Sequence, residues 1–71
     1  MSESVAVGIK NIIQEKGYRQ SAIAEKAGFP AQQFNDMLHN RKVIRADYLP
    51  YMSRALGVTV QEIYDAGRLE V

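Results

Sequence analysis

The sequence predicts an all-α protein, a compact domain of five short helices. Apolar residues recur at spacings of three and four through five segments, which is the period of an amphipathic helix. Glycines close four of these segments, and no stretch shows the apolar–polar alternation of a strand. A chain of 71 residues has room for one small domain. We therefore take 1–71 as a single domain, with 1–4 and 68–71 as frayed ends.

The first helix is expected to begin at Ser4, which suits an N-cap, and to end at Gly17. Its apolar side chains share one face: Val5, Ile9, Ile12 and Ile13. The second helix is expected over 20–27, where Ile23, Ala24 and Ala27 form a stripe. Arg19 stands just before it, where a capping serine or threonine would be stronger.

A third helix is expected over 30–39, after a tight turn at Gly28. Gly28 can adopt the left-handed conformation that ends a helix. Pro30 suits a first helical position because its φ is fixed and it has no N–H. Phe34, Met37 and Leu38 would face inward. The pattern is therefore helix, turn, helix.

Two more helices complete the predicted domain. One is expected over 46–56, with a firm start near Asp47 because Pro50 must lie close to the helix start, and Gly57 ends it. The run from Thr59 to Glu62 reads as a capping box. It opens a fifth helix that Gly67 would close.

The second and third helices resemble the helix-turn-helix of phage Cro proteins and repressors, often called the XRE family. Counted from Gln20, that motif has a small residue fifth, a glycine ninth, and apolar residues fifteenth and eighteenth. Ala24, Gly28, Phe34 and Met37 stand at these places. The resemblance extends over about residues 5–66 and implies a lambda-repressor-like, DNA-binding fold.

The sequence departs from the family at Ile13 and Leu38. Family members often carry arginine and glutamate there, paired between the first and third helices. Here both partners are apolar, and a buried ion pair can be replaced whole by apolar packing at little cost. We therefore expect Ile13 and Leu38 to touch in the core.

The outer face of the third helix is the candidate base-reading surface. Stepping 100° per residue from the apolar stripe, Gln32 and Asp36 point most directly outward. Glutamine can bond an adenine edge, aspartate can accept from cytosine N4, and Ala31 can touch a thymine methyl. An ordinary solvated polar face would look the same without the turn motif. The predicted base-reading residues are Ala31, Gln32, Asn35 and Asp36.

The segment that ends the third helix and follows it, 39–45, holds the basic cluster of the chain, Arg41, Lys42 and Arg45, and contains no acid. Residues that flank a recognition helix normally contact phosphates and fix its register. Gln20 can do so too, helped by free amides at the start of its helix. The predicted phosphate contacts are Gln20, Gln33, His39, Asn40, Arg41, Lys42 and Arg45.

Composition excludes several other classes. The chain has no cysteine and one histidine, so we expect no disulfide, metal site or cofactor. No nucleophile–base arrangement is readable, and we expect no enzyme activity. No apolar run could span a membrane and no signal peptide is visible. A bacterial or phage-encoded cytoplasmic protein fits these features.

The predicted function is sequence-specific binding of double-stranded DNA by a transcriptional regulator of phage or prophage Cro or repressor type. It would act as a weak homodimer on a pseudo-palindromic operator. The residues expected at the dimer interface are Tyr51, Val58, Leu69 and Val71. The alternative is a protein-interaction module with little DNA binding, which the net charge of only +1 and the acid Asp36 favour.

Overall fold

The computed structural model describes residues 2–68, and side chains from Val5 to Arg68. Within that range it contains helices and no strand, which confirms the all-α prediction. The five α-helices and one 3-10 turn are α1 (Ser2–Lys16), α2 (Gln20–Ala27), α3 (Ala31–Leu38), η1 (Ala46–Tyr48), α4 (Leu49–Leu56) and α5 (Val60–Arg68).

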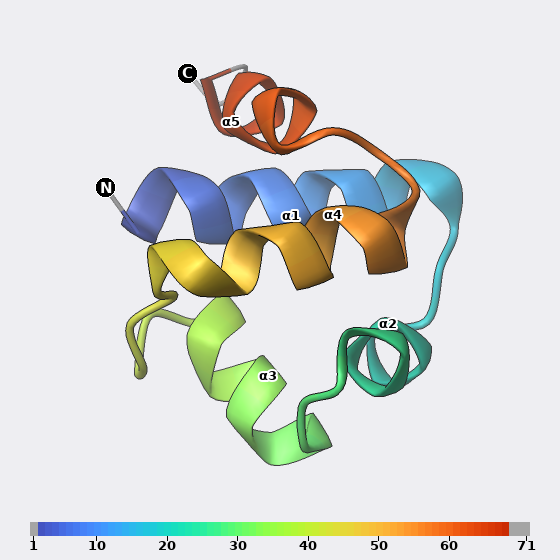
Figure 1. Ribbon diagram of the computed structural model, residues 1–71, viewed down its shortest axis with the longest axis vertical. Coiled ribbons are helices and arrows are strands. Elements are labelled where there is room, and N and C mark those ends of the chain that lie inside the picture. Colours follow the sequence, from blue (N-terminus) through green and yellow to red (C-terminus); the bar gives the residue numbers. More distant parts are fainter. Residues whose placement is uncertain (1, 69–71) are drawn as a thin grey trace.

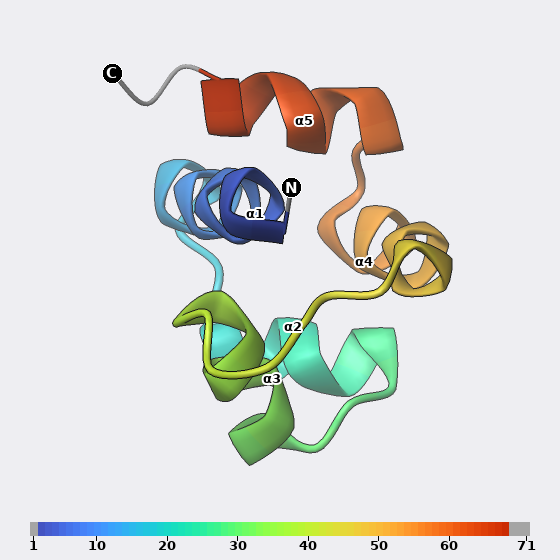
Figure 2. The ribbon, with the colours of Figure 1, turned by 90° about the vertical axis from the view of Figure 1, so that its left-hand side faces the viewer.

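The helices lie in three levels. α1 and α4 run alongside each other through the middle of the molecule (Figure 1). α5 packs along α1 on one side, and the α2–α3 pair lies on the other side (Figure 2). The largest fully buried side chains come from all five α-helices: Ile9, Ile23, Phe34, Met37, Leu38, Met52, Leu56 and Ile63. The helix-turn-helix therefore packs on a single core that all five α-helices share.

The turn between α2 and α3 has the predicted form. Gly28 has φ 86°, a left-handed conformation that a side chain would disfavour. Its N–H donates to the Glu25 carbonyl at 3.1 Å, and the Phe29 N–H donates to the Ala24 carbonyl at 2.9 Å. The Phe29 ring meets Tyr48 edge-on, with centroids 4.9 Å apart. The turn is thus held to η1 by an aromatic pair.

Several helix ends differ from the predictions. α1 begins at Ser2, so Ser4 lies inside the helix, because no proline or glycine interrupts the preceding turn. Pro30 is the N-cap of α3, with ψ 142°, and the helix runs from Ala31 to Leu38. The expected fourth helix divides into η1 and α4, with Pro50 in the first turn of α4.

Gly67 does not close α5, which continues to Arg68. Gly67 is buried instead, and a Cβ on Gly8 would lie 3.1 Å from its backbone nitrogen. That same Cβ would clash with the carbonyl oxygen of Ile63. The two glycines therefore allow the backbones of α1 and α5 to approach closely, which is a second reason for a glycine near a helix end.

The fifth helix begins with the predicted capping box. Thr59 Oγ1 accepts a hydrogen bond from the Glu62 N–H at 3.0 Å. Glu62 Oε1 accepts one from the Thr59 N–H at 2.8 Å. Two helix-start amides are thereby satisfied reciprocally.

The inward phasing of α3 is also confirmed. Phe34, Met37 and Leu38 are at most 1% exposed. Ile13 is partly buried and packs against the same apolar core. The opposite face of α3 is consequently turned away from the body of the domain (Figure 2).

Candidate nucleic-acid interface

The first turn of α3 offers side chains directly to the solvent. Ala31 and Gln32 are exposed there. Gln33, Asn35 and Asp36 are half-buried. The expected outward pair is therefore unequal, since Gln32 is open whereas only 17% of the Asp36 side chain is exposed.

Asp36 is hydrogen-bonded to two neighbouring side chains. Its Oδ1 accepts hydrogen bonds from Gln32 Nε2 and from Arg41 Nε, each at 3.1 Å. The hydrogen bond from Arg41 lowers the pKa of the Asp36 carboxyl below its usual value, partial burial opposes this, and Gln32 and the charge of Lys42 assist it. Sequence reasoning missed this ion pair, although the spacing of Gln32 and Asp36 at i, i+4 signals half of the network.

Asn35 joins α3 to α2. Its Oδ1 accepts a hydrogen bond from Gln20 Nε2 at 3.0 Å. Its backbone oxygen lies 2.8 Å from His39 Nδ1. A carbonyl can only accept, so Nδ1 carries the proton in this contact. Gln20, Asn35 and His39 thus lie together where the start of α2 meets the end of α3.

The start of α2 has unsatisfied amides. Its N-cap is Arg19, in extended conformation with φ −89° and ψ 133°, and no side chain caps the helix. Within residues 2–68 the backbone N–H groups of Gln20, Ser21 and Ala22 have no recorded acceptor. Such a helix start attracts anions. Arg19 is exposed beside it, and its position next to Gln20 is the signal that sequence reasoning overlooked.

The basic segment 39–45 leaves α3 through a sharp bend. Asn40 has φ 61°, the left-handed conformation expected for it. The N–H groups of Arg41 and Lys42 then both donate to the backbone oxygen of Asp36, at 2.8 and 3.3 Å. The segment is therefore fastened to the last turn of α3.

The cations of this segment differ in their partners. Arg41 pairs with Asp36, and Arg45 pairs with Asp47 through Nε and Oδ1 at 3.1 Å. Lys42 is exposed and has no ion-pair partner within the described chain. Both members of the Arg45–Asp47 pair are largely exposed, so water screens it.

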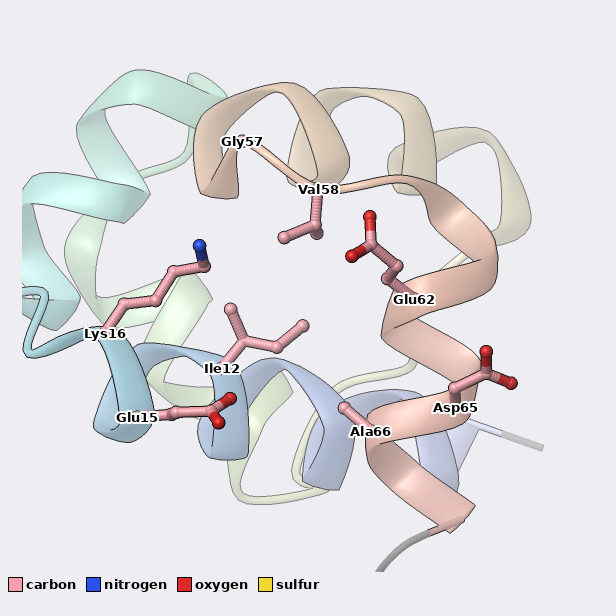
Figure 3. Close-up of a pocket in the computed structure, with 8 residues that line it drawn as sticks. All are labelled: Ile12, Glu15, Lys16, Gly57, Val58, Glu62, Asp65 and Ala66. Carbon is pink, nitrogen blue, oxygen red and sulfur yellow. The ribbon is translucent and has the colours of Figure 1, made fainter.

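A pocket of about 440 Å³ lies elsewhere, between α1, α5 and the turn that joins α4 to α5. Figure 3 shows Ile12, Val58 and Lys16 directed toward it. Its acids outnumber its one lysine, which disfavours phosphate. The acidic lining residues are Glu15, Glu62 and Asp65.

Two of the four residues predicted for the dimer interface lie within the described chain. Tyr51 is 54% exposed on α4. Val58 is half-buried and lines the pocket described above. Leu69 and Val71 lie outside the described residues.

The family profile of the Cro/C1-type HTH DNA-binding domain matches residues 8–66. The chain belongs to this family. The helix-turn-helix of this Cro/C1-type domain is α2, the turn at Gly28 and α3. The comparison with curated protein sequences gave no significant match.

A solved structure shares the whole architecture of the Cro/C1-type domain. The crystal structure of the clp gene regulator ClgR from C. glutamicum superimposes with a TM-score of 0.88 at 17% sequence identity. The match covers 99% of this chain and 91% of that chain. It confirms the fold.

Two findings concern other classes of site in residues 2–68. No helix there is both long and apolar enough to cross a membrane. Among the described side chains, from Val5 to Arg68, no cluster of three or more is suited to hold a metal ion.

Proposed function

We propose that this Cro/C1-type domain is a sequence-specific regulator of transcription, of phage or prophage Cro or repressor type, that binds double-stranded DNA. One observation carries the proposal. The exposed first turn of α3, the basic segment 39–45 and the uncapped start of α2 belong to one helix-turn-helix unit, joined by the Gln20–Asn35 and Arg41–Asp36 contacts. Base-reading and phosphate-binding groups are thus combined as a major-groove reader requires.

The base-reading surface would be the outer face of α3 in the major groove. Gln32, exposed on the first turn, suits adenine, and Ala31 suits a thymine methyl. Asn35 keeps its Nδ2 group available because only its oxygen is bonded to Gln20. Asp36 belongs to the same surface.

Phosphate contacts would come from both sides of α3. Lys42 and Arg41 follow it, and Gln20 with the free amides of α2 precedes it. Arg19, exposed at the same helix start, joins them. The remaining members of the proposed set are Gln33, His39, Asn40 and Arg45.

The regulator would act as a homodimer on a pseudo-palindromic operator. Two recognition helices would then enter major grooves about one helical turn apart. Occupation of such a site obstructs or adjusts access of RNA polymerase. Tyr51 and Val58 are the described residues that we assign to the subunit contact.

The test is to select bound duplexes from a random DNA pool and to titrate a selected and a random duplex at several salt concentrations. We expect one enriched, two-fold symmetric motif, and affinity for random DNA that falls linearly with salt on a log–log scale. Absence of binding to every duplex at low salt would overturn the proposal.

A second candidate function is a protein-interaction module with little DNA binding. The observation in its favour is charge: the chain carries only +1, and Asp36 neutralises one cation beside the recognition helix. For such a module, binding to DNA at low salt would be negligible, whereas a regulator binds random DNA appreciably under the same conditions.

A further inference from the structure

A single carboxylate oxygen on α3 holds two of the groups proposed to meet DNA. Oδ1 of Asp36 accepts from Gln32 Nε2 and from Arg41 Nε at equal distances of 3.1 Å. The carbonyl oxygen of the same residue accepts from the N–H groups of Arg41 and Lys42. Asp36 is therefore the common anchor of the first turn of α3 and of the basic segment.

The bond to Gln32 fixes which way its amide faces. An ionised carboxylate only accepts hydrogen bonds, so the amide nitrogen of Gln32 must face Asp36. Gln32 then presents Oε1 and its second N–H to the solvent. That acceptor and donor complement adenine, whose N6 donates and whose N7 accepts in the major groove.

The bond to Arg41 directs the Nε edge of its guanidinium toward Asp36. Only Nε is occupied, so the two terminal nitrogens remain as donors, and 59% of the side chain is exposed. Arg41 could then hold a phosphate and Asp36 together. Only 17% of the Asp36 side chain is exposed, which leaves it a poor reader of a base.

We propose that Asp36 determines base specificity without contacting a base. It is a positioning residue that orients the Gln32 amide for adenine and holds Arg41 toward the adjoining phosphate. The inference rests on the DNA binding proposed above. An aspartate on a recognition helix can itself select cytosine. Under this inference the base selection near Asp36 is instead made by Gln32, at adenine.

The test compares Gln32→Ala, Asp36→Ala and the double variant. Binding to the selected operator and to operators changed at single base pairs is measured by fluorescence anisotropy at one salt concentration. We expect Asp36→Ala to reduce discrimination about tenfold at the base pair that Gln32→Ala affects. The double variant should discriminate no less than Gln32→Ala alone, because the two residues act as one unit.

The matched control is Asp47→Ala. Asp47 also pairs with an arginine through Nε and Oδ1 at 3.1 Å, but it lies in η1 and has no recorded bond to α3. Its removal changes the charge equally. We expect it to shift affinity for all duplexes alike and to leave base preference unchanged.

A second variant, Asp36→Asn, tests the inference even if Asp36→Ala does not fold. Asp36→Asn keeps the size of the side chain but adds an N–H₂ group that can face Gln32 Oε1, which permits the reversed amide. In the free protein, the side-chain NH₂ signals of Gln32 should move when Asp36 is replaced by asparagine, and thermal unfolding should show a folded domain. Unmoved Gln32 signals would overturn the inference.

The outcomes separate the two proposals. If Asp36→Ala changes preference only at a neighbouring base pair and adds to Gln32→Ala, Asp36 reads a base itself and the inference is wrong. It is equally wrong if no base preference changes. A wild-type protein that binds no duplex overturns the proposed function first, and this inference with it.

Discussion

Leu38 shows how a single core position decides the orientation of α3. It is 1% exposed, while Ile13 is packed against the same core. We expect Leu38→Ala to lower the free energy of unfolding by roughly 2–5 kcal/mol, through lost burial and the cavity left behind. Urea unfolding followed by circular dichroism measures this, with Leu38→Met as a control of similar volume. A cost near that of an exposed site would contradict the buried Ile13–Leu38 contact that we predict.

Arg41 and Lys42 are neighbours with different surroundings. Replacing either with alanine should weaken binding to all duplexes and reduce the salt slope by about one. Arg41→Ala should lose more affinity than Lys42→Ala, because it also uncovers the negative charge of Asp36 beside the DNA. Anisotropy titrations across salt concentrations measure both quantities. An unchanged slope for either variant would remove that residue from the phosphate contacts.

Asp36 also makes a pH-dependent contribution to stability. Its hydrogen bond with Arg41 lowers the pKa of the folded carboxyl below the usual value of 3.8, while Gln32 and Lys42 act in the same direction. A lowered pKa means that the stabilisation is complete above the unfolded pKa and is lost as pH falls through the folded pKa. The difference in stability between wild type and Asp36→Asn should therefore vanish in acid. Denaturant unfolding at several pH values tests this, and a constant difference would contradict it.

At the scale of elements, the helix starts are capped unequally. α5 has a complete capping box, whereas α2 and α3 have no side-chain cap. Arg19 already has the extended conformation of an N-cap, so Arg19→Ser should stabilise the domain by about 0.5–2 kcal/mol. Thr59→Ala should destabilise the domain by a similar amount, because it removes a side-chain cap where Arg19→Ser adds one. Thermal and denaturant unfolding compare them, and a destabilised Arg19→Ser variant would show that the arginine does more than begin the helix.

The helix ends at Gly28 and Gly57 and the start of α5 could be predicted because they depend on local chemistry. Gly28 and Gly57 adopt left-handed conformations where the sequence places them, and the capping box forms within one turn. Gly67 could not be interpreted correctly, since its role depends on α1, a helix distant in sequence. The Arg41–Asp36 pair was equally hidden, because it requires the chain to turn back at Asn40 and bring two side chains together.

For the whole molecule, the apolar stripe of each helix predicted one common core. The sequence did not predict how side chains from different segments meet on the surface. Helical spacing identifies an outer face for α3, and Gln32 lies on it as expected. The exposure of Asp36 depends on the path of the basic segment, which periodicity does not describe. The residues of a subunit interface were harder still to predict from the sequence. Val58, for example, lines a pocket rather than an open face.

Oligomeric state is the prediction that belongs to this scale. We expect a weak dimer that DNA completes, because Tyr51 at 54% exposure and the half-buried Val58 offer a small apolar contact among the described residues. Such a contact lies below the size of most stable interfaces. Sedimentation velocity over a range of concentrations, with and without operator DNA, tests this. A tight dimer at nanomolar concentration without DNA would refute it.

The contact of Gly8 with α5 has a consequence for how this domain can diversify. Because the Ile63 carbonyl lies directly on Gly8, the main chain sets the spacing between α1 and α5. Gln61 is exposed on α5 and does not line the pocket between α5 and α1. Mutation can therefore rewrite the outer surface of α5 without displacing α3, so new attachments can evolve or be engineered there while the opposite end keeps its shape.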